Sequence, residues 1–548
     1  MAAPSPGAAA PPHTSSASST TAAAAASGQA SSPGACRLHE KFENYHEIIV
    51  VGAGIAGLSA AYHIMKAQND SDVLVLEARE RLGGRVLHAK LGDTQVELGA
   101  RWIHGVLGNP LYEFAVSQGL VGLNDQASMQ HNVVVTTERG SQIPLDLIDE
   151  VYSAYFWFSK RCEEYHLTRL KPPPEFDNSV GKHIQRDIDG YLKRYSGEEK
   201  KVRQMIFTHV KDRDACIAGA DSMDTVSLED FGAFAELPGG NVILGKGKKS
   251  FFELCLRLAE PLGSDRIKMS CRVNKIRWKM ISGDLYDCDT VRVETSAGLF
   301  HCSHLIVTLP LGVLKESVDL FVPRLPSMKT QAVDRLQFAT VNKLYILFNR
   351  PVLNKEIDEV LCLWEPCDTY IESEWWKKIY SFSKLSDTIL CCWLSGLEAE
   401  LLEHLSDDEV ITRITEVLRG FLADPYVPRP VQVVCSRWKT DPYSRGSYTS
   451  ISSQASQQDI DNLAKPLYTG PFQSKPKVLF AGEATHSTFY STAHGAFISG
   501  QRCANLLTTG DPESCDFPEG WINSSSRRSS TADLSSWLKG IDIRRQIR

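Results

Sequence analysis

Three glycines at the spacing Gly-x-Gly-x-x-Gly, followed by one acidic residue, are the first residues whose types suggest chemistry. They are Gly52, Gly54 and Gly57, and Glu77 lies 20 residues beyond the last of them. In a dinucleotide-binding turn, the first glycine permits a tight bend, the second lets backbone approach a pyrophosphate, and the third lets a helix pack closely on a strand. The later acidic residue accepts hydrogen bonds from a ribose. The pattern predicts a dinucleotide site and leaves NAD and FAD equally open.

The residues around this turn have the order strand, turn, helix, strand that such a site needs. The β-branched run Ile48–Val51 leads into the turn, a helical pattern covers residues 56–67, and the apolar strand Val73–Leu76 ends at Glu77. The helix N-terminus would offer unpaired N–H groups and a positive dipole end to phosphate. A glycine-rich turn in an ordinary strand-helix unit is the alternative, and it is disfavoured because all the parts occur together.

Length and composition limit the class of protein. A chain of 548 residues is too long for one simple core, so we expect two or three domains. Hydrophobic residues make up 43% and charged residues 23%, as in a typical globular protein. The net charge of −7 disfavours a nucleic-acid-binding protein. No apolar run reaches the ~20 residues needed to span a bilayer.

The 14 cysteines are spread along the chain without a Cys-x-x-Cys pair of zinc spacing, so we predict no metal site. The N-terminus lacks the basic start and leucine-rich core of a signal peptide. Reduced thiols in an intracellular compartment are the simplest interpretation.

A further strand-turn-helix pattern, the third along the chain, occurs near the C-terminus. An apolar strand from residue 477 ends in Gly482-Glu483, and a helix pattern then runs from Thr492 to Leu507. Between the first pattern and this one, residues 145–215 are predicted to be mostly helical. The strands predicted for a second, antiparallel sheet are 344–348, 360–364, 379–382 and 388–394, followed by a helix at 407–422. The nucleotide-binding part is therefore expected to be interleaved in sequence with another domain.

Both ends of the chain have compositions typical of disorder. Residues 1–36 are nearly all Ala, Ser, Pro, Gly and Thr, which cannot bury enough apolar surface to offset the entropy of ordering. We assign residues 1–44 to a low-complexity tail and residues 508–548 to a flexible C-terminal tail.

Several blocks together resemble the flavin-containing amine oxidases. They are Val51–Leu58, Glu77–Arg85, Trp102–Gly105, Phe480–His486 and Ser491–Ala496. The strings Trp-Ile-His-Gly, Ser-Met-Asp-x-Val-Ser-Leu, Arg-Gly-Ser-Tyr and Tyr-Ser-Thr-Ala-His-Gly are similar to the animal polyamine oxidases, the branch of acetylpolyamine and spermine oxidases. The resemblance covers roughly residues 45–507.

The resemblance implies an α/β fold, in which a doubly wound FAD-binding domain is interleaved with an α+β substrate-binding domain. The segments predicted for the FAD-binding domain are 45–130, 235–320 and 435–507. Those predicted for the substrate-binding domain are 131–234 and 321–434.

The same resemblance implies where FAD would lie. The pyrophosphate is expected on Gly52, Gly54, Ala56 and Gly57, with Glu77 on the adenosine ribose. The other residues expected to bind FAD are Arg85 at the phosphates, Val273 at the adenine end, and Arg101, Trp102, Trp438, Glu483, Thr492 and Ala493 along the ribityl chain and flavin.

The attachment of FAD is predicted from one position. Monoamine oxidases hold FAD covalently through a cysteine in Gly-Cys-Tyr-Thr, and the matching string here is Gly446-Ser447-Tyr448-Thr449. With serine in that place, the resemblance implies non-covalent FAD. Monoamine oxidases also end in a membrane helix, which this sequence lacks.

The implied reaction is the oxidation of an amine. The substrate passes a hydride to the flavin, water hydrolyses the resulting iminium to an aldehyde and a shorter amine, and O₂ reoxidises the flavin to give hydrogen peroxide. Lys343 matches a family lysine that holds a water against the flavin, and burial would lower its pKa. His104 matches a histidine that faces the substrate amine. Its ordinary pKa of ~6.5 suits positioning and proton exchange near neutrality.

Selectivity is predicted from the segment before Ser222-Met223. Spermine oxidases carry an acid and a serine there, where this chain has Ile217 and Gly219, and they tend to carry Asp in the place of Asn342. Fewer carboxylates should weaken binding of an extra ammonium. Acetylated spermine and spermidine are therefore the preferred substrates, and free spermine stays open. Thr492 is also assigned to the substrate site.

Other interpretations are kept beside this one: a spermine oxidase proper, a non-catalytic flavoprotein scaffold, and a demethylase of methyl-lysine. The expected partners are a polyamine and O₂, with no nucleic acid and no membrane span, in a monomer or weak homodimer. Some acetylpolyamine oxidases are peroxisomal, but Arg545–Arg548 is not a Ser-Lys-Leu type ending, so cytoplasm is the expected location.

Overall fold

The computed structural model describes residues 42–121, 132–244, 250–279, 290–366, 374–469 and 475–511. The predicted disorder of residues 1–36 and most of the predicted C-terminal tail lie outside the described residues.

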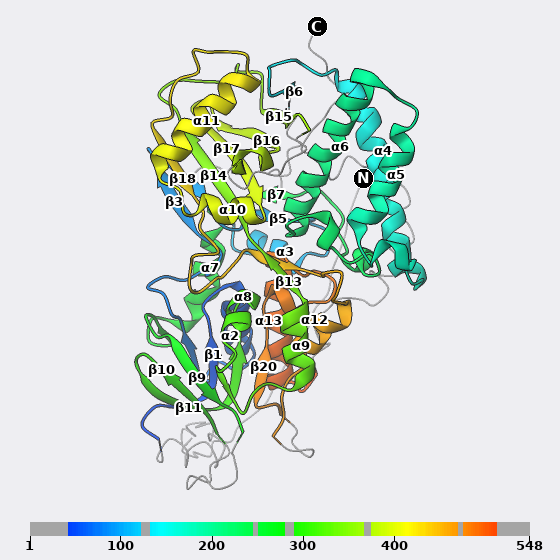
Figure 1. The fold of residues 1–548 in the computed structure, drawn as a ribbon. Helices are drawn as coiled ribbons and strands as arrows, with labels where there is room; N and C mark the ends of the chain where they lie inside the picture. The colour runs from blue at the N-terminus through cyan, green and yellow to red at the C-terminus, as the bar shows by residue number, and fades with distance from the viewer. Residues whose placement is uncertain are drawn as a thin grey trace, which may run out of the picture. The chain divides into compact units, whose positions relative to one another are not determined.

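The glycine turn follows β1, an inner strand of an eight-stranded mixed sheet (Figure 1). The strand order is β12-β9-β10-β11-β1-β2-β8, and β20 also pairs with β11. β1 runs parallel to β2 and β11, and β20 runs parallel to β11, whereas β9 and β10 form antiparallel pairs. The strands are β1 (Tyr45–Val51), β2 (Val73–Leu76), β8 (Ile267–Lys268), β9 (Val273–Arg277), β10 (Val291–Thr295), β11 (Gly298–Val307), β12 (Phe321–Val322) and β20 (Val478–Phe480).

Helices cover both faces of this sheet. Side chains alternate along β1, so Ile48 and Val50 face one side while Ile49 and Val51 face the other. The first side packs against α2 (Ile55–Ala67), α7 (Phe252–Ala259) and α13 (Ala493–Thr508). The second packs against α8 (Leu311–Glu316), α9 (Ser327–Arg335) and α12 (Gln457–Ala464). This doubly wound arrangement confirms the predicted fold class. β12 and α9, which follow the boundary predicted at residue 320, pack with this sheet.

A six-stranded sheet with the order β18-β14-β17-β16-β15-β6 forms a second layer. Its strands are β6 (Val133–Thr137), β14 (Val341–Leu347), β15 (Glu359–Leu363), β16 (Ser381–Ser386), β17 (Ile389–Ser395) and β18 (Gln432–Cys435). α10 (Leu397–Leu402) and α11 (Asp407–Phe421) pack on one face. The four strands predicted for an antiparallel sheet do pair antiparallel, whereas β6, which was not predicted, pairs with β15 in parallel.

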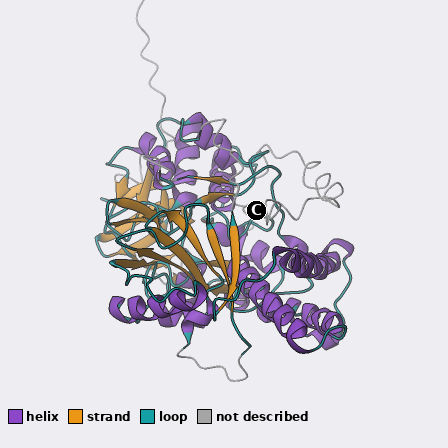
Figure 2. Cartoon of the chain, turned by 90° about the horizontal axis from the view of Figure 1, so that it is seen from above, coloured by secondary structure: helices purple, strands orange, loops and turns teal. Residues whose placement is uncertain are grey.

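The predicted helical region forms three long helices, α4 (Leu145–Thr168), α5 (Val180–Leu192) and α6 (Gly197–Ala218), which are among the purple helices of Figure 2. Their apolar core also includes residues of β6 and β15. The remaining short elements are α3 (Pro110–Ser117), β3 (His88–Leu91), β4 (Thr94–Glu97), β5 (Trp102–Ile103), β7 (Val242–Ile243), β13 (Gln337–Ala339) and β19 (Tyr448–Ser450). The 3₁₀ helices are η1 (Pro174–Phe176), η2 (Met223–Thr225), η3 (Phe231–Ala233), η4 (Glu260–Leu262), η5 (Trp375–Lys378) and η6 (Glu483–Thr485).

Helix α2 is fixed on two sides by backbone contacts that only glycine permits. A Cβ atom at Gly57 would come within 1.9 Å of the Gly52 carbonyl oxygen, so the helix lies directly against the turn. On the other side, a Cβ at Gly500 of α13 would come within 2.2 Å of the Ala56 carbonyl oxygen. The first turn of α2 is therefore held between β1 and α13.

We expect Gly500→Ala to lower the thermal unfolding midpoint, because the added methyl has no space and overpacking costs about 1–3 kcal/mol. Gly190→Ala is the matched control. Gly190 lies on the exposed face of α5, and a Cβ there would have no atom within 4 Å. That change should leave the midpoint unchanged or raise it, because alanine favours a helix over glycine by about 0.5–1 kcal/mol. Equal midpoints for the two variants would contradict the close helix contact.

Candidate active site

A cavity of about 4060 Å³ brings together residues from both sheets and from the long helices. Its wall includes the turn after β1, the start of β14, and residues of α4 and α6. Ordinary ligand pockets measure about 300–1,000 Å³. This cavity has room for a large cofactor and a separate substrate.

The glycine turn has the conformation that its sequence predicts. Gly52 has a positive φ of 104°, which favours glycine. Gly54 has an ordinary extended backbone and lines the cavity, and a Cβ there would meet only the Gly83 carbonyl oxygen, at 3.9 Å. The protein itself therefore leaves space at Gly54, on the side where a ligand would approach. Ala56 also lines the cavity, whereas Gly57 makes the helix contact described above.

The end of α2 and the carboxylate of Glu77 complete a cradle suited to a dinucleotide. No side chain caps the N-terminus of α2, and no acidic residue lies in its first turn, so its N–H groups and dipole favour an anion. Glu77 is buried on the cavity wall and accepts hydrogen bonds from the Ala53 and Arg79 N–H groups at 2.8 and 2.9 Å. This arrangement fits a pyrophosphate with an adjacent ribose.

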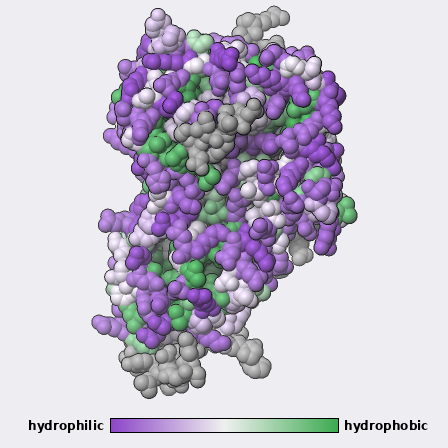
Figure 3. Space-filling model, in the orientation of Figure 1, coloured by the Kyte–Doolittle hydropathy of each residue, from purple (hydrophilic) through white to green (hydrophobic). Residues whose placement is uncertain are grey.

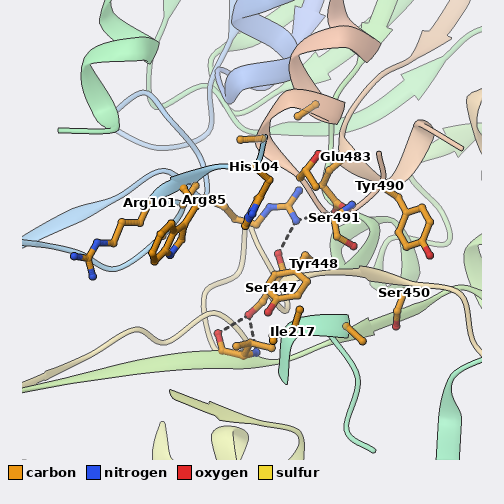
Figure 4. Close-up of a pocket in the computed structure, with 18 of the residues that line it drawn as sticks. Arg85, Arg101, His104, Ile217, Ser447, Tyr448, Ser450, Glu483, Tyr490 and Ser491 are labelled. Atoms are coloured by element: carbon orange, nitrogen blue, oxygen red, sulfur yellow. Dashed lines mark hydrogen bonds and ion pairs between the residues drawn. The ribbon is translucent and has the colours of Figure 1, made fainter. Parts of the chain in front are cut away.

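Arg85 and Glu483 form an ion pair that links the first strand-turn-helix unit to the last. The Arg85 guanidinium lies 2.9 Å from the Glu483 carboxylate and donates to the Ser447 carbonyl at 2.7 Å (Figure 4). Glu483 also accepts bonds from Thr449 and from the Ser491 N–H. Both charged residues line the cavity. The guanidinium is thus already paired, and a phosphate contact for Arg85 stays a prediction.

Lys343 lies inside β14 and not just before a strand, because the strand begins three residues earlier than predicted. The side chain is buried on the cavity wall, where its Nζ atom donates to the carbonyl oxygens of Glu97 and Gly99 at 2.9 and 2.5 Å. The Nζ atom also lies 4.6 Å from the centre of the Trp393 ring. The end of β4 and the neighbouring strand β17 therefore fix the amino group.

Burial lowers the pKa of Lys343 to about 7. The nearby Arg101 lowers this pKa further, whereas Cys391 and Glu97 raise it. The predicted direction of the shift is confirmed. Near neutral pH the side chain is divided between its ammonium and its neutral amine.

His104 faces the cavity from the segment after β5, opposite Ser447 and Tyr448 (Figure 4). A Cβ at the following Gly105 would come within 2.2 Å of the Leu237 carbonyl oxygen, so neighbouring backbone fixes this segment. The side chain is exposed to the open cavity, yet the protein packed around it lowers the pKa of His104 to about 4 by desolvation, against the opposing effect of a hydrogen bond with Asn241. The pKa of His104 is thus lower than the ordinary value assumed from the sequence, and proton exchange near neutrality stays a prediction.

The prediction that Asn342 contacts substrate is wrong. Side chains alternate along β14, so Asn342 points away from the cavity that Lys343 lines. Its amide nitrogen donates to the Ala399 carbonyl and to the Glu403 carboxylate at 3.0 and 2.7 Å, and its side chain is fully buried. Asn342 fixes α10 against β14.

Of the two positions predicted to set selectivity at the end of α6, the cavity wall includes only one. Ile217 lines the cavity and is 40% exposed (Figure 4). Gly219 does not line it, which corrects the predicted substrate contact. It ends α6 with a positive φ of 66°, and a Cβ there would come within 2.5 Å of the Tyr448 ring. Glycine is required at 219 by the backbone and by Tyr448.

The other residues predicted to bind cofactor all lie on the cavity wall: Arg101, Trp102, Val273, Trp438, Thr492 and Ala493. Their individual roles stay predictions. No role was predicted from the sequence for Tyr345, whose hydroxyl donates to the Glu97 carbonyl at 2.8 Å beside Lys343. Residues two apart in a strand lie on the same face, so the spacing from Lys343 could have indicated Tyr345.

The part of the chain that the structure describes contains neither a metal-binding cluster nor a membrane-spanning helix. No group of three or more His, Cys, Asp or Glu side chains there could hold a metal ion. None of the described helices is long and apolar enough to cross a membrane, and hydrophilic side chains predominate on the face shown in Figure 3.

Comparison with known proteins identifies the family. The sequence model described as flavin containing amine oxidoreductase matches residues 55–508. The match covers most of the chain, which therefore belongs to this family and is an FAD-dependent enzyme. The glycine turn, the uncapped helix and Glu77 are consistent with that cofactor.

Similar proteins include amine oxidases from animals and a histone demethylase from a plant. The Bos taurus protein named peroxisomal N(1)-acetyl-spermine/spermidine oxidase is 33% identical over 506 residues, covering 86% of this chain and 96% of that protein. The Homo sapiens protein of the same name is 33% identical over 493 residues, covering 84% and 94%. An Arabidopsis thaliana protein named lysine-specific histone demethylase 1 homolog 1 is 31% identical over 473 residues, covering 84% of this chain and 52% of that protein.

We expect Gly54→Val to abolish FAD retention while the protein still folds, because the new side chain would fill the cradle without meeting protein atoms. The ratio of flavin to protein absorbance after purification measures this. Gly240→Val is the control, since Gly240 lines another part of the cavity and a Cβ there meets nothing within 4 Å. A Gly54→Val protein with full flavin content would refute the assigned cradle.

Lys343→Met should change how stability depends on pH. Because the pKa of Lys343 falls from 10.5 to about 7 on folding, the unfolded chain binds more protons between these values, and stability rises with pH there. The variant lacks this contribution, so the stability of the wild type relative to the variant should rise from about pH 7 towards pH 10. Thermal unfolding of both proteins across this range measures the difference. A difference that does not vary with pH would contradict a buried, neutral Lys343.

Proposed function

We propose that this chain, as a flavin-containing amine oxidase, oxidises secondary amines of acetylated polyamines to an aldehyde, a shorter amine and hydrogen peroxide. The observation that carries the proposal is the buried Lys343 amino group, held by two carbonyl oxygens on the wall of the cavity that also contains the dinucleotide cradle. Similarity to animal proteins named as oxidases of acetylated polyamines supports the choice of substrate.

The cofactor and the side chains of the protein contribute different parts of the reaction. Bound FAD would supply the capacity to accept a hydride, and with it two electrons, from the carbon next to the amine nitrogen. The chain's own side chains bind and orient the amine, exclude bulk water and control protons. We propose that the eight-stranded sheet carries FAD and that the six-stranded sheet with α4–α6 carries substrate.

Lys343 is suited to act on water. A neutral amine has two N–H groups, and the carbonyls of Glu97 and Gly99 accept one hydrogen bond each. The remaining lone pair can then accept a hydrogen bond or a proton from a water molecule in the cavity. A pKa of about 7 suits this role, because general bases work best near the operating pH. We assign Lys343 to orienting and activating water for hydrolysis of the oxidised amine or for reoxidation.

His104 is suited to position the substrate nitrogen. A neutral imidazole can donate one hydrogen bond and accept another without adding a positive charge. Aliphatic amines are mostly protonated at neutral pH, and the reaction requires their neutral form. Since the pKa of His104 is lowered to about 4, its ring does not repel an arriving ammonium. We assign it to substrate binding rather than to obligatory proton transfer.

Two features support acetylated substrates and non-covalent FAD. Ile217 presents an apolar side chain to the cavity at a place where spermine oxidases are expected to carry an acid. The Ser447 hydroxyl accepts a hydrogen bond from the Val341 N–H and donates one to the Val341 carbonyl, each at 2.8 Å. It therefore holds the backbone at the start of β14. Serine lacks the thiol through which monoamine oxidases are expected to bind the flavin.

The substrate panel for the test is acetylspermine, acetylspermidine, spermine and a methylated histone peptide, with peroxide release as the readout. We expect the acetylated polyamines to react with the highest kcat/KM, spermine more slowly, and the peptide not at all. A preference for spermine would favour a spermine oxidase, activity on the peptide a demethylase, and no peroxide from any substrate a non-catalytic flavoprotein.

Lys343→Met should retain FAD but lose turnover by about 100-fold or more, as expected for removal of a group that moves protons. Lys329→Met is the matched control. Lys329 is also buried with a pKa lowered to about 7, but it donates to the carbonyls of Asn462 and Leu463 away from the cavity. Its loss should leave turnover per bound flavin unchanged. Unaltered flavin reduction and reoxidation rates in Lys343→Met would exclude the role assigned to Lys343.

A further inference from the structure

Glu236 lies on the cavity wall, in the segment that joins η3 to β7. Hydrogen bonds fix the backbone on both sides of it. The Ala235 N–H donates to the Thr488 carbonyl at 3.2 Å, and the Pro238 carbonyl accepts from the Val106 N–H at 3.0 Å. The carboxylate is therefore carried by a segment held against the one that follows β5.

The Glu236 carboxylate makes no hydrogen bond or ion pair with any residue that the structure describes. Its side chain is exposed to the cavity, yet the protein packed around it raises the pKa of Glu236 to about 7 by desolvation. Lys160 of α4 lowers this pKa and Glu163 raises it. The Lys160 amino group is itself paired with Glu163 at 2.8 Å. Glu236 is thus a poorly solvated acceptor without a partner.

The chemistry of a carboxylate defines the group that fits this place. An ionised carboxylate only accepts hydrogen bonds, and an ammonium only donates them. An ammonium also brings the opposite charge, which offsets the desolvation of the carboxylate. A neutral hydroxyl or amide would leave that charge uncompensated. A single carboxylate is too few ligands for a metal ion, and the described residues contain no group of three that could hold one. The fitting ligand is an organic cation.

The position of Glu236 relates it to the nitrogen that is oxidised. His104, assigned above to that nitrogen, lies on the cavity wall immediately before Gly105. The Gly105 N–H donates to the Asn241 side-chain oxygen at 3.1 Å, so the segment of Glu236 and the segment of His104 are joined directly. The reacting nitrogen must lose its proton, whereas any other amine of a polyamine stays protonated near neutral pH. A carboxylate in this place suits such a second nitrogen.

We propose that Glu236 binds a protonated nitrogen of the substrate other than the one that is oxidised. This inference rests on the proposed function and narrows its substrates to amines that carry a second, cationic nitrogen. The contact would fix how far the chain of the substrate enters the cavity. Ile217 on α6 offers no charge, so the acidic contact is assigned to Glu236 and not to that position.

The test compares two substrates that differ only in the second nitrogen. N(1)-acetylspermidine and N-[3-(butylamino)propyl]acetamide share the acetylated arm and the reacting secondary amine, but the second compound lacks the terminal ammonium. The wild type should prefer acetylspermidine in kcat/KM by about 10- to 100-fold, the range for a hydrogen bond to a charged group. Glu236→Gln should lose most of this preference through acetylspermidine and leave the butyl compound unchanged.

Glu164→Gln is the matched control. Glu164 also lines the cavity, and the variant removes the same charge, but from an exposed place on α4 where salt screens it. This variant should keep the preference of the wild type. An equal effect of the two variants would show a general attraction of cations and refute a contact with Glu236. Equal losses for both substrates in Glu236→Gln would also refute it.

The stability of the variant tests whether the carboxylate is free. Glu236→Gln should not lower the thermal unfolding midpoint at pH 8, because desolvation disfavours the ionised carboxylate in the folded protein. A lowered midpoint would show that the carboxylate stabilises the fold through a partner of its own, which contradicts a site open to a ligand.

A binding measurement separates this inference from the proposed function. The primary diamine 1,4-diaminobutane should raise the unfolding midpoint of the FAD-loaded wild type and of Glu164→Gln, but not that of Glu236→Gln. If the wild type releases no peroxide from any polyamine but keeps this shift, the proposed function fails while the ammonium site stands. If the wild type oxidises polyamines and the shift is absent or independent of Glu236, only the ammonium site is refuted.

Discussion

The close backbone packing around the first turn of α2 is the constraint on which the rest of the site depends. Gly57 places the helix directly on the turn at Gly52, and Gly500 places α13 against the helix from the other side. Both contacts are between main-chain atoms, which have no rotamers with which to adjust. The position of the helix N-terminus, and with it the phosphate end of the cradle, is therefore set by the sheet and α13 together. A ligand that lies on this terminus meets a preformed surface.

From that anchor, the cavity is assembled by pairs of residues that are distant in sequence. Arg85 reaches Glu483, and Lys343 reaches the carbonyls of Glu97 and Gly99. The second contact joins the six-stranded sheet to the segment that follows the first strand-turn-helix unit. The amino group expected to serve the substrate is thus positioned by backbone next to the cofactor region. A shift between the two layers would disturb it directly.

The sequence predicted the features that depend on local geometry. The glycine spacing, the acid after the second strand and the repeated strand-turn-helix unit each carry a short-range physical reason, and the family resemblance indicated FAD. What could not be predicted depends on which way a side chain points and what surrounds it. Asn342 and Lys343 are adjacent, yet alternation along β14 sends one to α10 and the other to the cavity. The low pKa of His104 arises from tertiary surroundings, which leave no short-range signal.

The left-handed end of α6 has a consequence for how substrate preference can change during evolution. At Gly219, any side chain would combine an unfavourable backbone conformation with a contact of 2.5 Å to the ring of Tyr448. Tyr448 in turn fixes α6 through the Cys216 carbonyl. A serine at position 219 is therefore not reachable by one tolerated substitution, because the ring and the helix end must change with it. Ile217 is under no such restriction, so new specificity at this corner of the cavity would arise first at position 217.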